Sequence, residues 1–144
     1  MKTNSYTLVY SNYDEDTGVS IVKINTDVGV FTGSAKCHPD EKIKSKYYGC
    51  QLAEGRALLA YQRELVKIGK AQRDALFNLN TTVCQLRDYQ KDNIYTSKIR
   101  RAMYEKQEWI DKREEEIYRL KLRITTLQHE REAAMRQISG GKEK

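Results

Sequence analysis

The sequence predicts an α+β fold in which a small N-terminal antiparallel β-sheet precedes a long C-terminal antiparallel helical hairpin. Two observations support this fold class. In the first third of the chain, β-branched and aromatic residues recur in short runs separated by turn residues. From about residue 45 onward there is no proline, and apolar residues recur at three- and four-residue steps. We therefore expect a β-sheet region over residues 1–44 and a two-helix hairpin over residues 45–144.

Three strands are expected in the first region. The residues that mark them are Tyr6, Leu8 and Tyr10 on one face of the first strand, Val19, Ile21 and Ile24 in the second, and Val28, Val30 and Thr32 in the third. Val22 is expected on the opposite face of the second strand. An acidic loop that ends at Gly18 and a turn at residues 25–27 separate the strands, and such short connections predict an antiparallel meander.

The first helix is expected to follow Pro39, which is the only proline and ends the strand pattern. From about Ser45 its apolar residues are Leu52, Leu58, Leu59, Leu65, Val66, Leu76, Leu79, Val83 and Leu86. The segment from Asn78 to Thr82 holds poor helix formers, so we expect a bend there or the polar wall of a site.

The second helix is expected after a turn between Asp88 and Thr96, with Thr96 or Ser97 as its cap. Its apolar residues are Ile99, Met103, Ile110, Ile117, Leu120, Ile124, Leu127, Ala134 and Ile138, and two glycines end it at 140–141. Lys106, Arg113 and Arg131 occupy positions where a coiled-coil seam would carry apolar residues. The seam of the hairpin is therefore imperfect.

A homo-oligomer, a dimer at least, is expected because apolar residues fall on several faces of the hairpin. Trp109 and Ile110, for example, are adjacent, and adjacent helical residues do not share a face. Only 39% of the 144 residues are hydrophobic, so one chain alone has a small core. The net charge is +6 and all of the excess follows residue 50, which fits either phosphate-bearing partners or a solvated helix surface.

Several classes of protein are not expected. No Gly-rich phosphate loop and no Ser or Cys with a plausible His partner is visible, so we expect no enzyme. Cys37 and His38 are adjacent, but the only other histidine is His129, so we expect no metal and no cofactor. Three cysteines fit reduced thiols in a cytoplasm. The absence of a long apolar run and the polar N-terminus predict no membrane span and no signal peptide.

Among the possible functions, the residue types favour binding of a phosphorylated ligand. An Arg guanidinium donates two hydrogen bonds to phosphate, an aromatic ring stacks on a base, and Asn binds ribose hydroxyls. The candidate ligand-binding residues are Arg56, Phe77, Asn80, Tyr89, Asn93, Arg100 and Arg101. Alternatives stay open, since Phe77 at helical spacing is also typical of a core residue and Arg100-Arg101 of surface charge.

The segment from Phe31 to Glu41 (FTGSAKCHPDE), followed by Gly49, Ala53 and Arg56-Ala57-Leu58, resembles the Thoeris anti-defence family of small bacteriophage proteins. The matching segment ends at about residue 59, and the order of a β-rich start and two long helices is similar too. The resemblance implies a signal sponge, which binds a cyclic ADP-ribose isomer made by a bacterial immune enzyme and does not degrade it. It also implies nucleotide sites between protomers, hexamers that hold cyclic oligonucleotides in some members, and a cytoplasmic location in the infected bacterial host cell.

Two other hypotheses belong to different classes. A basic helical protein can block a nucleic-acid or defence-effector partner directly, and binding to DNA or RNA would then depend steeply on salt. Nucleic acid is nevertheless not the partner that we expect. A structural oligomer without a ligand is the third hypothesis, and an unchanged melting temperature across nucleotides would favour it.

Overall fold

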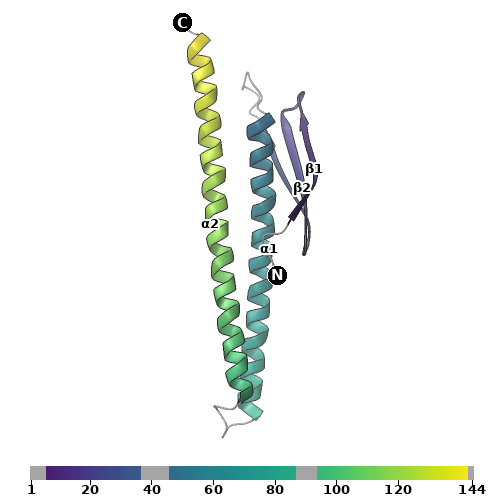
Figure 1. The fold of residues 1–144 in the computed structure, drawn as a ribbon, viewed down its shortest axis with the longest axis vertical. Helices are drawn as coiled ribbons and strands as arrows, with labels where there is room; N and C mark the ends of the chain where they lie inside the picture. The colour runs from purple at the N-terminus through teal and green to yellow at the C-terminus, as the bar shows by residue number, and fades with distance from the viewer. Residues whose placement is uncertain (1–5, 37–45, 87–93, 143–144) are drawn as a thin grey trace. The chain divides into compact units, whose positions relative to one another are not determined.

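The computed structural model describes residues 6–36, 46–86 and 94–142, and it has the predicted α+β architecture (Figure 1). The elements, in chain order, are strands β1 (Tyr6–Asp14), β2 (Val19–Thr26) and β3 (Gly29–Lys36) and helices α1 (Lys46–Leu86) and α2 (Ile94–Lys142). The strands pair antiparallel in the order β1-β2-β3. The predicted meander and the predicted pair of long helices are therefore confirmed.

A bulge at Val9 changes the predicted facing of β1. Leu8 pairs with Ile24 and Tyr10 pairs with Lys23, so Val9 is an extra residue without a partner on β2. One inserted residue reverses which face the following side chains occupy. Tyr10 therefore lies on the face opposite Tyr6 and Leu8, and the prediction that these three residues share a face is wrong.

In β2 the two buried apolar side chains are Val22 and Ile24, which share one face of the sheet. Val19 and Ile21 lie on the other face and are half-buried. The prediction that grouped Ile24 with Val19 and Ile21 is thus wrong, because residues three apart in a strand fall on opposite faces. Val28 also belongs to the turn before β3, which begins one residue later.

Helix α1 runs without interruption through the segment from Asn78 to Thr82. The hydroxyls of Thr81 and Thr82 each donate a hydrogen bond of 3.0 Å to the carbonyl four residues earlier. These bonds satisfy the threonine hydroxyls inside the helix, which is not broken at this segment. Helix α2 begins at Ile94, two residues before Thr96, and the prediction that Thr96 or Ser97 caps it is also wrong.

The chain divides into two compact units, which are described separately. Unit 1 comprises residues 1–61 and 117–144, and unit 2 comprises residues 62–116. All strands precede residue 44 and both helices follow residue 45, as the predicted regions require. The assignment of those two regions as domains stays a prediction.

In unit 1, one face of the sheet packs directly on the first half of α1. Gly33 of β3 lies so close to α1 that a β-carbon there would collide with the carbonyl oxygen of Ala53 and the amide nitrogen of Ala57. Only glycine permits such an approach of two backbones. Leu52, Ala53 and Ala57 are accordingly fully buried, so the small residues of α1 set how closely the sheet lies on the helix.

Tyr61 is the largest side chain that is fully buried in the described residues. Its hydroxyl donates a 2.8 Å hydrogen bond to Asp27, in the turn between β2 and β3. Its ring lies 5.6 Å from the ring of Phe31, centroid to centroid. Tyr61 thus joins α1 to both β3 and the turn before it.

The second half of α2 joins unit 1 through two contacts with α1. The side chain of Ile124 lies against Gly55, where a β-carbon would be 3.2 Å away. The guanidinium of Arg123 donates a 3.0 Å hydrogen bond to Gln51. Ile124 and Arg123 therefore fix this part of α2 beside the early turns of α1.

In unit 2, α1 and α2 pack antiparallel around Gly69. A β-carbon at Gly69 would lie 2.7 Å from the ring of Trp109 and 3.0 Å from the side chain of Ile110. Both side chains therefore contact α1 at the position where a side chain is missing. Trp109 and Ile110 therefore do not need a second chain to cover one of them, and that part of the inference is wrong. The homo-oligomer itself stays a prediction.

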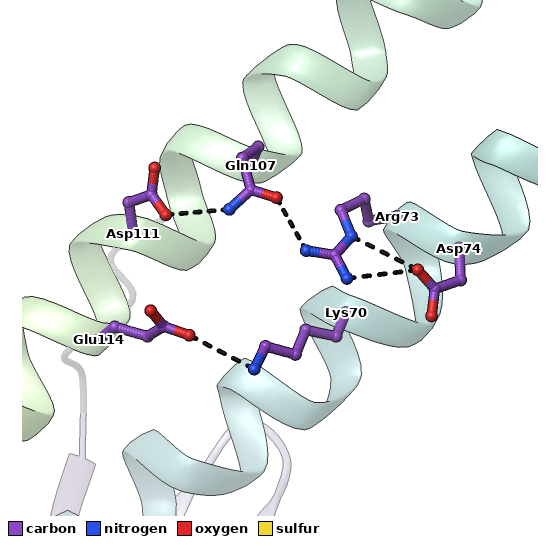
Figure 2. A network of polar contacts seen from close by, with 6 residues as sticks. All are labelled: Lys70, Arg73, Asp74, Gln107, Asp111 and Glu114. Atoms are coloured by element: carbon purple, nitrogen blue, oxygen red, sulfur yellow. Dashed lines mark hydrogen bonds and ion pairs between the residues drawn. The ribbon is translucent and has the colours of Figure 1, made fainter.

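A polar network fixes the register of the two helices in unit 2 (Figure 2). Lys70 forms a 3.4 Å ion pair with Glu114, and Arg73 donates a 2.8 Å hydrogen bond to Gln107. Gln107 in turn donates to Asp111 over 2.9 Å. As residue numbers rise along α1 their partners fall along α2, which confirms an antiparallel hairpin within this unit.

Candidate functional site

Arg56, the candidate that belongs to the matched segment, lies in unit 1 and supports the sheet. Its guanidinium donates a 2.7 Å hydrogen bond to the backbone carbonyl of Ser34 in the edge strand β3. The side chain is half-buried, and the neighbouring Gly55 and Ala57 are buried. At least one donor of Arg56 therefore holds β3, and the other candidates described by the structure lie in unit 2.

The loop end of unit 2 brings Phe77 and Asn80 onto successive turns of α1. Phe77 is 58% exposed, so it is not part of the core of a single chain. The amide oxygen of Asn80 is buried and has no hydrogen-bond partner in the described part of the chain. A buried acceptor without a donor is unfavourable by about 1–3 kcal/mol, and an external donor reaches this oxygen only when the Asn80 side chain turns outward.

Arg100 is placed opposite Asn80 by the register of the hairpin. Arg73 bonds Gln107, and two helical turns further from each of them are Asn80 on α1 and Arg100 on α2. The Arg100 side chain is exposed and its Nε lies 3.4 Å from the carbonyl of Thr96, which it hydrogen bonds. Phe77, Asn80 and Arg100 therefore occupy one end of the hairpin, and we call these three residues the loop-end patch.

Arg101 lies at the same end of α2 but in a different environment. Its side chain is 83% exposed and forms a 3.2 Å ion pair with Glu105, one turn along the helix. Such exposed pairs contribute little to stability, about 0.3–0.5 kcal/mol. Of the other candidates, Tyr89 and Asn93 lie outside the described residues, as do Cys37 and His38.

Two of the basic residues at seam positions, Lys106 and Arg113, lie against the ring of Trp109, which was not predicted from the sequence. The ammonium of Lys106 lies 5.0 Å from the centre of the Trp109 ring, and the guanidinium carbon of Arg113 lies 5.9 Å from it. Each of these contacts contributes about 0.5–1 kcal/mol at an exposed site. The signal was present in the sequence, since the two basic residues stand three before and four after the only tryptophan.

Tyr6 and Glu54 form a polar contact between β1 and α1. The Tyr6 hydroxyl donates a 2.8 Å hydrogen bond to the Glu54 carboxylate. This bond, with a smaller contribution from burial, raises the pKa of Tyr6 above its usual value, and nearby Arg123 opposes the rise. Tyr6, Glu54 and Arg123 therefore lie close together at one end of β1.

Two further observations limit the chemistry of the described segments. In residues 6–36, 46–86 and 94–142, no three or more His, Cys, Asp and Glu side chains gather in a group suited to a metal ion. Over the same segments, neither α1 nor α2 contains a stretch long and apolar enough to cross a lipid bilayer.

Comparison of the chain with family models, with curated proteins and with solved structures finds no match.

Proposed function

We propose that this chain binds and sequesters a cyclic ADP-ribose-type immune signal, without degrading it, in the cytoplasm of an infected bacterial cell. The chain would act as a homo-oligomer, a dimer or a hexamer, and cyclic oligonucleotides are a second candidate ligand. The family resemblance of residues 31–59 suggests this function. The observation that carries it is the loop-end patch, where exposed Phe77 and the unpartnered amide oxygen of Asn80 lie at the end of α1.

The chemistry of the loop-end patch suits an adenine nucleotide that carries phosphate. Stacking of a base on an aromatic side chain such as Phe77 contributes about 1–3 kcal/mol. A ribose hydroxyl or an adenine amino group can donate the hydrogen bond that the Asn80 oxygen lacks. The guanidinium of Arg100 can bind a phosphate oxygen through charge-assisted hydrogen bonds.

Sequestration requires affinity and a sufficient number of protein molecules, but no chemical step. A nanomolar dissociation constant corresponds to about 12 kcal/mol of binding free energy. Stacking, one hydrogen bond and one phosphate contact supply only part of that, so further contacts from the same or another protomer are needed. The proposed homo-oligomer offers such contacts because each added protomer brings its own patch.

The first test measures the thermal stability of the purified chain with cyclic ADP-ribose, its glycosidically linked isomers, and cyclic di- and trinucleotides. A ligand that binds the folded state at one hundred times its dissociation constant stabilises it by about 2.7 kcal/mol, so we expect a rise in melting temperature with one class. The bound ligand should be recovered chemically intact after denaturation. Recovery of cleaved ligand would contradict sequestration, and no shift with any nucleotide would favour a direct nucleic-acid or effector partner.

The second test asks whether the loop-end patch makes the contact. We expect Phe77→Ala and Arg100→Gln each to weaken binding about 10- to 100-fold, because each removes roughly 1.5–3 kcal/mol of stacking or charge-assisted bonding. Leu79→Ala is the matched control for the first, since Leu79 is 49% exposed on the same turn of α1. Lys112→Gln is the charge-matched control on α2. Equal effects of variants and controls in titration calorimetry would place the ligand elsewhere.

A further inference from the structure

Strand β1 forms an edge of the sheet, and its apolar side chains are exposed. The exposed fractions are 39% for Tyr6, 53% for Leu8, 59% for Val9 and 44% for Tyr10. We call these four residues the β1 margin. From Tyr6 to Tyr13 the strand contains no charged residue and no proline, two of the usual protections of an edge strand, and its one such device is the bulge at Val9. An apolar edge of this kind is typical of a surface that another chain covers.

The margin is exposed because the buried residues of the sheet lie in β2 and β3. Leu8 and its partner Ile24 share a face of the sheet, yet Ile24 is 0% exposed and Leu8 is 53% exposed. Sheet and helix approach closely at Gly33 in β3, and also where Gly49 of α1 faces Ser20 of β2. The hydroxyls of Tyr6 and Ser11 donate to Glu54 and Cys50 of α1, but the apolar side chains of β1 extend beyond the buried part of the sheet.

The opposite edge of the sheet differs in chemistry. On β3, Arg56 donates its hydrogen bond to the carbonyl of Ser34, and the strand ends in exposed Lys36. A guanidinium bonded to the strand and a lysine at its end are both protections against pairing with another strand. A contact from β1 of one copy to β3 of the next would be head-to-tail, forming a ring or an open filament, and these groups oppose it.

We propose that the β1 margin binds the same margin of a second copy of this chain, with the two β1 strands antiparallel across a two-fold axis. The inference names the interface for the homo-oligomer in the proposed function and does not depend on its ligand. Because Val9 bulges out of the strand, side chains of the margin make the contact, rather than an unbroken ladder of backbone hydrogen bonds.

A second copy is the occupant that charge favours. The four margin side chains are themselves uncharged, so they place no like charges directly opposite each other, which would be destabilising. The ammonium of Lys23 lies beside them, 5.7 Å from the centre of the Tyr10 ring. The end of β1 and the acidic turn that follows it contain Asp14, Glu15 and Asp16, whereas Arg123 lies near Tyr6 at the other end of the strand. An antiparallel arrangement brings each acidic turn toward the Arg123 of the other copy, twice by symmetry. The Glu54 carboxylate at that end already accepts the hydrogen bond from Tyr6.

The test compares Val9→Lys with Val30→Lys in the full chain, without nucleotide, by sedimentation and light scattering over a concentration series. Val30 is the matched control, because both valines are 59% exposed and they lie on opposite edges of the sheet. We expect the wild type to self-associate. Val9→Lys should weaken that association at least about tenfold, because the lysines of the two copies would face each other across the interface. Val30→Lys should leave the association unchanged.

Circular dichroism and melting curves separate a lost interface from a lost fold, and Leu8→Lys provides a second variant of the margin. A wild-type chain that stays monomeric at micromolar concentrations would overturn the inference. So would association that survives both margin variants, or equal weakening by Val9→Lys and Val30→Lys. A dimer that depends on the margin but binds no nucleotide would support this inference and contradict the proposed ligand, so the two failures are distinguishable.

Discussion

Substitution of Gly33 by alanine is expected to separate the sheet from α1 and to destabilise unit 1 by several kcal/mol. The added β-carbon would collide with the carbonyl oxygen of Ala53 and the amide nitrogen of Ala57. Both atoms belong to the backbone of a helix, so no side-chain rotation relieves the collision. Ordinary overpacking costs about 1–3 kcal/mol, and a collision between two backbones belongs at or above the upper end of that range. Urea denaturation followed by circular dichroism, at one fixed protein concentration, measures the loss.

Gly29→Ala is the control for the collision. Gly29 has a φ of +130°, which strains an alanine, but a β-carbon there meets nothing within 4 Å. Its expected loss is about 1–3 kcal/mol, from backbone strain alone. Adding Ala53→Gly to Gly33→Ala is expected to restore nothing, since the colliding atoms are backbone atoms. A Gly33→Ala chain as stable as the wild type would show that β3 does not lie on α1 in this way.

The sequence predicted the fold class because local periodicity determines it. Alternation over short runs gave the three strands, and three- and four-residue steps gave two long helices. The facing of Tyr10 was beyond such reasoning, since a bulge arises from pairing with β2 and Val9 is an ordinary strand residue. The poor helix formers at residues 78–82 do not break α1, because intrinsic propensity is a weak preference that tertiary context overrides.

The candidate site was predictable in residue type but not in placement. Phe77 and Arg56 both fit ligand chemistry in sequence, yet Phe77 is exposed while Arg56 holds the carbonyl of Ser34. Which of them is available depends on packing between elements distant in the chain, and a single sequence does not contain that information. Two glycines could have predicted part of the packing. Gly33 in a strand and Gly69 in a helix both indicate the close approach of another element.

Substitution of Tyr61 by alanine is expected to destabilise unit 1 by about 3–5 kcal/mol, as for other large buried aromatic residues. Tyr61 is 0% exposed, its ring packs beside Phe31, and its hydroxyl binds Asp27, so the change leaves a cavity between α1 and β3. Chemical denaturation measures the loss. Tyr104→Ala is the matched control, because Tyr104 is 71% exposed and its removal should change stability by less than about 0.5 kcal/mol.

The ring and the hydroxyl of Tyr61 can be separated by a conservative variant. Tyr61→Phe keeps the ring and removes only the hydrogen bond to Asp27, so the expected loss is about 1 kcal/mol. Asp27→Ala should have little further effect in the Tyr61→Phe background, since the two changes remove the same bond. Additive losses would mean that the bond contributes nothing, and a Tyr61→Ala loss no larger than that of Tyr104→Ala would mean that α1 and β3 do not enclose this ring. The comparison therefore tests the packing that holds Gly33 and Arg56 in place, on which the arrangement of the whole sheet against α1 depends.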